Sequence, residues 1–132
     1  MITEDYVSFE TAKLLKEKGF DEYGMYFYTL EDEGEEGYKS NRRLQELAHN
    51  SHPELEKRAV SCPTLQMAMK WLREIHSLEI YPYHDYTDGN EKWWFEIIKF
   101  RSSYAEHESG SIYLKYEDAC EAAIKYCLEN LI

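Results

Sequence analysis

Apolar residues recur at helical spacing in three segments of the chain. Residues 7–20 (VSFETAKLLKEKGF), 63–76 (PTLQMAMKWLREIH) and 116–132 (YEDACEAAIKYCLENLI) carry apolar side chains every three or four positions. In the first segment, Ser8 suits the N-cap position and Gly19 suits a left-handed C-terminal stop. We predict that each segment is a helix with one apolar stripe, which has to be buried.

The apolar stripes of the second and third predicted helices are continuous. The stripe of the second helix consists of Leu65, Ala68, Leu72 and Ile75, widened by Met69, Trp71 and His76. The stripe of the last helix consists of Cys120, Ala123, Ile124, Cys127, Leu128 and Leu131. Free cysteine in such a position behaves as a small hydrophobic residue, so Cys120 and Cys127 are predicted to lie in the core.

Apolar and polar positions alternate in other parts of the chain. This pattern predicts strands over residues 23–30, 78–84, 91–100 and 111–116. Between the second and third of these strands, Asp88-Gly89 is a strong signal for a tight hairpin turn. The third strand (EKWWFEIIKF) carries bulky apolar side chains at positions of both parities, so the turn decides which of them face the core.

The length of the hairpin loop sets the register of that strand. A two-residue Asp88-Gly89 loop places Tyr83 opposite Trp94, whereas a three-residue loop places Trp93 beside Tyr83. The first register also sets opposite charges against each other across the strands, and we favour it for that reason.

Residues 41–62 have the weakest pattern. The stretch NRRLQELAHN (41–50) is compatible with two or three helical turns, and the residues after it resemble a polar connection. The glycine-broken acidic run before it, residues 31–41, predicts a solvated loop.

This order of elements predicts an α+β fold. Strands joined by tight turns form an antiparallel sheet, here of three to four strands, and amphipathic helices bury their stripes on one face of it. The length of 132 residues fits a single domain spanning residues 1–132.

Aromatic residues gather on one face of the predicted sheet. The aliphatic residues keep one strand parity, taken to face the helices: Met25, Phe27, Leu78, Ile80, Ile112 and Leu114. The other parity holds the candidate binding residues Tyr26, Tyr28, Tyr81, Tyr83, Trp94 and Tyr113. A contiguous aromatic patch marks an interface more often than bare surface. Two alternatives stay open: tyrosine is simply a good strand former, or residues 41–62 cover the face as a second core.

Charge limits the classes of partner. The formal net charge is −11, from 26 acidic residues against 15 lysines and arginines, which disfavours direct binding to nucleic acid. No apolar run approaches the roughly 18 residues of a membrane span, and the N-terminus lacks the pattern of a signal peptide. We therefore expect a cytoplasmic protein whose three cysteines are reduced thiols.

Sequence motifs for catalysis or metal binding are weak. His49 and His52 have a spacing that suits a metal on one helical face, and Cys62 follows ten residues later, but no CxxC or HExxH motif accompanies them. Nothing near Cys62 specifies a catalytic triad. The sequence predicts no cofactor, no metal and no enzymatic activity.

Three blocks carry a resemblance to known sequences: residues 2–22, residues 63–76 and residues 116–132. In these blocks the chain resembles a group of small uncharacterised proteins encoded by prophages and mobile elements of gut anaerobic bacteria. The resemblance implies a bacterial, phage-associated context and transfers no site residue. Residues 31–60 depart from the group in length and charge.

Two functions fit these observations. The first is a non-catalytic interaction module that uses the aromatic face to bind a protein partner or to form a homodimer. The alternative is an acidic decoy that imitates DNA and occupies a nucleic-acid-binding protein. Exposed charges are screened by salt and apolar contacts are not, so salt dependence separates the two.

Overall fold

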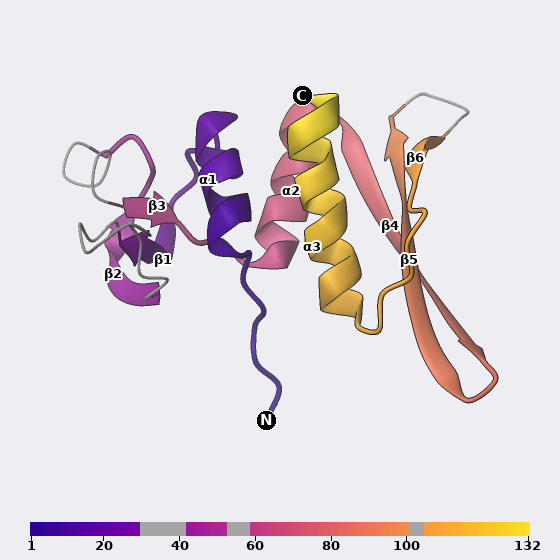
Figure 1. Ribbon diagram of the computed structural model, residues 1–132. Coiled ribbons are helices and arrows are strands. Elements are labelled where there is room, and N and C mark those ends of the chain that lie inside the picture. The colour runs from indigo at the N-terminus through magenta and orange to yellow at the C-terminus, as the bar shows by residue number, and fades with distance from the viewer. Residues whose placement is uncertain (30–41, 53–58, 101–104) are drawn as a thin grey trace, which may run out of the picture. The chain divides into compact units, whose positions relative to one another are not determined.

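The computed structural model of the chain describes residues 1–29, 42–52, 59–100 and 105–132 (Figure 1). It confirms the predicted α+β class, with helices and antiparallel sheets. The chain divides into two compact units, Met1–Thr64 and Leu65–Ile132, and each unit contains a three-stranded sheet. The assignment of residues 1–132 to a single domain stays a prediction.

The first unit combines one helix with one sheet. Its elements are α1 (Phe9–Glu17), β1 (Gly24–Thr29), β2 (Arg42–Ala48) and β3 (Ala59–Ser61). The sheet order is β2-β1-β3, and both pairings are antiparallel. Residues 42–48, whose sequence is compatible with helical turns, therefore form a strand instead. Leucine, glutamine, glutamate and alanine favour a helix in isolation, but pairing with β1 overrides that weak preference.

The two ends of α1 confirm the predicted start and stop signals. The Thr11 amide donates to Ser8 Oγ at 3.3 Å, which satisfies one of the free N–H groups of the first turn. At the other end Gly19 has a φ of +95°, its amide donates to the Lys16 carbonyl, and the Phe20 amide donates to the Leu15 carbonyl. This pair of bonds is a Schellman motif, so glycine is needed for its backbone conformation.

The second unit packs two helices on one sheet. Its elements are α2 (Leu65–His76), β4 (Leu78–Thr87), β5 (Asn90–Lys99), β6 (Ala105–Glu108), α3 (Tyr116–Tyr126) and a π-helical turn η1 (Cys127–Leu131). The sheet order is β4-β5-β6, antiparallel throughout. Both helices lie on the same side of this sheet: α3 packs against β4 and β5, and α2 packs against β4 and α3 (Figure 1).

The β4–β5 hairpin has the register that a two-residue loop predicts. Its cross-strand pairs include Ile80 with Ile97, Tyr83 with Trp94 and Asp85 with Lys92. Asp88 and Gly89 have φ values of +58° and +74°, the left-handed conformation at both central positions that defines a type I′ turn. The twist of that turn matches the twist of the two long strands, so the hairpin is locally consistent.

The core of the second unit lies between the two helices and one face of the sheet. Its buried side chains are Leu65, Ala68, Met69, Trp71, Leu72, Leu78, Ile80, Phe95, Ile97, Ala119, Cys120, Ala123, Ile124, Cys127 and Leu128. The prediction that Cys120 and Cys127 are core residues is confirmed, because both are fully buried.

Four aliphatic residues predicted to face the core are exposed instead. Ile112 and Leu114 are 62% and 75% exposed because the strand predicted over 111–116 is reduced to one backbone bridge, between Tyr113 and Trp93. Ile75, at the end of α2, is 60% exposed, and Met25, at the start of β1, is 49% exposed. Near the end of a helix or strand, the apolar periodicity of the sequence continues although the element no longer packs against a neighbour. Periodicity alone therefore predicts burial for residues that are exposed.

Candidate functional site

The sheet of the second unit presents a face that its helices do not cover. We define the outer face as the surface formed by Glu79, Tyr81, Tyr83, Trp94, Glu96 and Glu108. These residues alternate with buried ones along β4 and β5, or lie opposite Glu96 on β6. Buried Ile80 and Ile97, which point to the helices, show that the outer face points away from them.

An aromatic pair lies at the centre of the outer face. The rings of Tyr83 and Trp94 stack with their centroids 5.8 Å apart and their planes at 16°. Tyr83 Oη donates a hydrogen bond of 2.8 Å to Glu96 Oε2, which fixes the ring over its neighbour. Tyr81 and Tyr83 remain 43% and 39% exposed. The pair is therefore ordered by contacts within the hairpin and still accessible.

The outer face carries negative charge. The hydrogen bond to Glu96 raises the pKa of Tyr83 above its ordinary value of 10.0, and the charges of Glu96 and Glu108 raise it further. The hydrogen bond is the largest cause, and the nearby carboxylates act in the same direction because they disfavour a second negative charge beside them. At one margin, Glu79 forms an ion pair of 3.5 Å with Arg73 of α2.

The structure separates the six predicted binding residues: two lie in the sheet of the first unit, three lie in the sheet of the second unit, and Tyr113 lies outside the named strands. Tyr81, Tyr83 and Trp94 share the outer face as predicted. Tyr113 forms two 2.8 Å backbone bonds with Trp93, and its ring stacks on buried Phe95, which belongs to the opposite parity.

Tyr26 and Tyr28 belong to β1, in the sheet of the first unit. Tyr28 is only 6% exposed, because its hydroxyl donates to the Val7 carbonyl at 2.6 Å and the Phe9 ring packs edge-on against its own ring. The prediction that Tyr28 points away from the core is therefore wrong. Tyr26 is half-buried and contacts the ring of Tyr6, at a centroid distance of 5.0 Å.

The described part of residues 41–62 forms strands β2 and β3 and the turn after β2, and residues 53–58 lie outside the described residues. Strands β2 and β3 flank β1 at its two edges, in the plane of the sheet. Residues 49–52, which follow β2, are anchored by Asn50, which is buried. Asn50 Nδ2 donates to the Phe20 carbonyl at 2.7 Å, and Asn50 Oδ1 accepts from the Ser61 amide at 2.8 Å.

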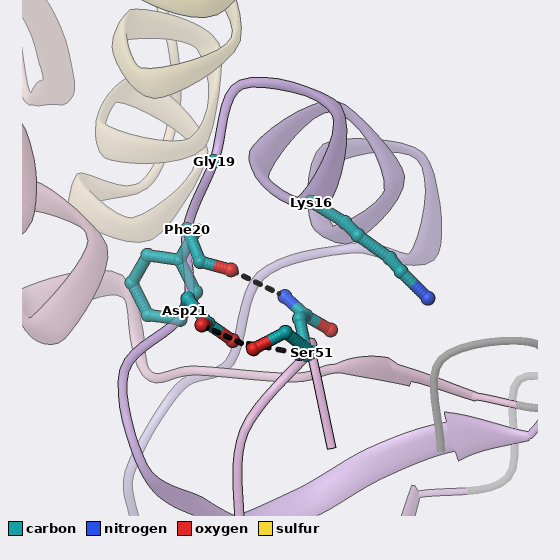
Figure 2. A pocket seen from close by; sticks show the side chains of 6 residues that line it. Lys16, Gly19, Phe20, Asp21 and Ser51 are labelled. Atoms are coloured by element: carbon teal, nitrogen blue, oxygen red, sulfur yellow. Dashed lines mark hydrogen bonds between the residues drawn. The ribbon is translucent and has the colours of Figure 1, made fainter. Parts of the chain in front are cut away.

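A pocket of about 270 Å³ lies beside this anchor in the first unit. Its lining residues are Lys16, Gly19, Phe20, Asp21, Asn50 and Ser51 (Figure 2). Asp21 and Ser51 face each other there: the carboxylate accepts from Ser51 Oγ at 2.5 Å and from the Ser51 amide at 2.7 Å (Figure 2). Asp21 Oδ1, which accepts from the Ser51 amide, also lies 2.9 Å from His49 Nδ1.

The Asp21, His49 and Ser51 side chains do not form a catalytic triad. A triad needs the carboxylate at Nδ1 of the histidine and the serine at Nε2, whereas here both groups lie at Nδ1. Burial raises the pKa of Asp21, but the hydrogen bonds from Ser51 and His49 lower it by more, and the result lies below the ordinary 3.8. Three donors thus hold the carboxylate ionised, and the cluster tethers residues 49–52 to the end of α1.

The metal and thiol candidates can also be placed. Within the described parts of the chain no three histidine, cysteine or acidic side chains are grouped to hold a metal ion. Cys62 is 3% exposed and its Sγ lies 3.8 Å from the Val7 carbonyl oxygen. Burial raises the pKa of Cys120 to about 11 and that of Cys127 to about 12, so these thiols are poor nucleophiles.

Comparison with known proteins gives no relative. No protein-family model matches the chain, and neither the curated proteins nor the solved structures contain a significant match. Among the described residues, no helix is long and apolar enough to cross a membrane.

Proposed function

We propose that the chain is a non-catalytic protein-interaction module that binds its partner through the outer face of the β4–β5 hairpin. The observation that carries this proposal is the stacked Tyr83–Trp94 pair, which is held in place by Glu96 and remains accessible. The far end of the hairpin extends beyond α2 and α3, which leaves both of its sides open to a partner within this unit (Figure 1).

The physical advantage of such a site is its low cost of ordering. A protein pays about 0.5–1.5 kcal/mol to immobilise each flexible side chain at an interface. Tyrosine and tryptophan have few rotatable bonds, and here stacking and one hydrogen bond already restrict them. Aromatic residues of this kind dominate the binding energy of many interfaces. The outer face therefore has the composition and the rigidity of a binding surface.

Site-specific photo-crosslinking tests this proposal. A photoreactive amino acid replaces Tyr81 on the outer face or, as a matched control, Tyr86, which is 64% exposed on the opposite parity of the same strand. Incubation with a lysate of the producing organism should crosslink one partner from position 81 and not from position 86. Sedimentation of the purified chain tests self-association in parallel.

Substitution provides the second arm of the test. The double variant Tyr81→Glu with Tyr83→Glu should no longer bind the partner that crosslinking identifies, whereas Tyr86→Glu should still bind it. Circular dichroism should show the wild-type fold for both variants, since all three side chains are exposed. Binding that survives the double substitution in a folded chain would refute the outer face as the binding surface.

A further inference from the structure

We infer that the outer face binds an arginine-bearing segment of a partner protein, rather than a second copy of this chain. This inference rests on the proposed function and specifies the chemistry of the partner. It follows from the combination of accessible aromatic rings with carboxylates on one sheet face.

Carboxylates lie on the same face as the aromatic pair. Glu96 lies beside Tyr83, Glu108 is its cross-strand neighbour on β6, and Glu79 lies at the margin. One oxygen of Glu96 accepts a hydrogen bond from the Tyr83 hydroxyl. The carboxylate has further lone pairs, so it can accept a hydrogen bond from another donor as well. Near the turn, the charge of Lys92 lies directly across the strands from that of Asp85. Along the strand positions of this face that the structure describes, Lys92 is the single basic residue, against the four acidic residues Glu79, Asp85, Glu96 and Glu108.

The accessible rings complement a cation. The faces of tryptophan and tyrosine attract a positive charge held within about 6 Å of the ring centroid, and tryptophan does so most strongly. A guanidinium group is planar, so it can stack on an aromatic ring. Its N–H groups can at the same time donate hydrogen bonds to a carboxylate beside that ring. The neighbouring positions of Trp94, Tyr83 and Glu96 supply these two kinds of contact together.

The same charges disfavour self-association through this face. In a two-fold dimer the same patch is used on both subunits, so Glu96 and Glu108 of one copy would approach those of the other. Like charges set against each other weaken an interface and select against a wrong partner. The net charge of −11 adds a general repulsion between copies. A basic partner gains from each of these features instead.

Titration with model peptides tests the inference on the full-length chain. The probes are a capped heptapeptide of alternating glycine and arginine, its lysine counterpart and its glutamate counterpart. The indole N–H signal of Trp94 is followed by NMR, with Trp94→Phe to assign it. We expect the arginine peptide to shift this signal and to bind about two- to fivefold more tightly than the lysine peptide, while the glutamate peptide causes no shift.

Variants separate the outer face from general charge attraction. Glu96→Gln should weaken binding of the arginine peptide about two- to fivefold, whereas Glu91→Gln, the matched control at the opposite parity of β5, should change it less. Equal binding of the arginine and lysine peptides, or equal effects of the two substitutions, would overturn the inference. So would complete loss of the Trp94 shift in 0.5 M NaCl, which would indicate screened charge attraction alone.

The two experiments fail independently. If crosslinking from position 81 identifies a partner whose contact segment is neutral or acidic, or a second copy of this chain, the proposed function stands and the arginine inference is wrong. If no crosslink forms from position 81, or if the identified partner still binds the folded double tyrosine variant, the proposed function is wrong as well.

Discussion

The buried thiol of Cys127 provides a sensitive test of the packing between helix and sheet. The side chain is fully buried, and burial raises its pKa to about 12. Alanine at this position removes one apolar atom and should cost about 1 kcal/mol, close to the value of one methylene group. Serine keeps the shape but buries a hydroxyl, which costs about 1–3 kcal/mol. A bond from that hydroxyl to a carbonyl of the preceding helical turn brings the cost toward the lower value.

The informative result is which of the two variants has the lower free energy of unfolding. In an apolar site the polar isostere Cys127→Ser should be less stable than the truncation Cys127→Ala, whereas at an exposed site both stay within about 0.5 kcal/mol of the wild type. Urea unfolding followed by tryptophan fluorescence measures this, because Trp71 is buried in the same unit. The matched pair Glu129→Ala and Glu129→Ser tests an exposed position two residues away.

Thiol labelling checks the same assignment without a substitution. The thiolate is the reactive form, and a pKa of about 12 leaves about one thiol in ten thousand ionised at pH 8. Native Cys127 should therefore react with a disulfide reagent orders of magnitude more slowly than in the chain unfolded by guanidinium. Rapid native labelling, or alanine and serine variants that both stay within about 0.5 kcal/mol of the wild type, would refute the burial of this thiol.

Three further predictions concern single groups. Burial lowers the pKa of His76 below 6.5, so the unfolded chain binds this proton more tightly than the folded chain. The free energy of unfolding should therefore fall as the pH drops from 7.5 to 5.5, and urea titration should show a smaller fall for His76→Phe. Gly89→Ala should cost about 1–2 kcal/mol in thermal unfolding through its positive φ, although no atom lies close enough to clash. Glu96→Gln should lower the pKa of Tyr83 toward 10.0 in an NMR titration, and an unchanged pKa would contradict the observed hydrogen bond.

The elements that could be predicted from the sequence are those with local signals. Ser8 and Gly19 mark the ends of α1 because capping involves residues only a few positions apart. The type I′ turn at Asp88-Gly89 follows from the two residues that best tolerate left-handed backbone. Pairing of β1 with β2 was missed, since the strand at residues 42–48 is made of good helix formers and depends on a distant partner.

The candidate site was predictable to the same extent. Alternation along one hairpin places Tyr83 and Trp94 together, and the structure agrees. The burial of Tyr28 depends on the Val7 carbonyl, 21 positions away, and no local pattern reports it. The tether between Asp21 and Ser51 joins residues 30 positions apart for the same reason. Strand parity gives the orientation of a side chain, but what covers it is decided by contacts between distant parts of the chain.

The register of β5 poses the question of whether the turn or the core fixes the outer face. Insertion of one glycine after Gly89 separates the two causes. If the two-residue turn is dominant, the inserted residue joins the strand, and Tyr83 meets Trp93 in place of Trp94. That slip would turn Phe95 outward together with the other core side chains of β5.

The energies of the two outcomes differ widely. Exposing buried Phe95 and Ile97 costs about 1.5–3 kcal/mol for each side chain, and the slip would also bring the Glu96 carboxylate toward the core. Lengthening the loop by one residue costs only about 1 kcal/mol, because closure entropy grows slowly with loop length and one more residue is ordered. The core should therefore hold the register, and the nuclear Overhauser contact between Tyr83 and Trp94 should persist in the insertion variant. A contact between Tyr83 and Trp93 in its place would show that the turn fixes the register and, with it, which tryptophan the hairpin offers to a partner.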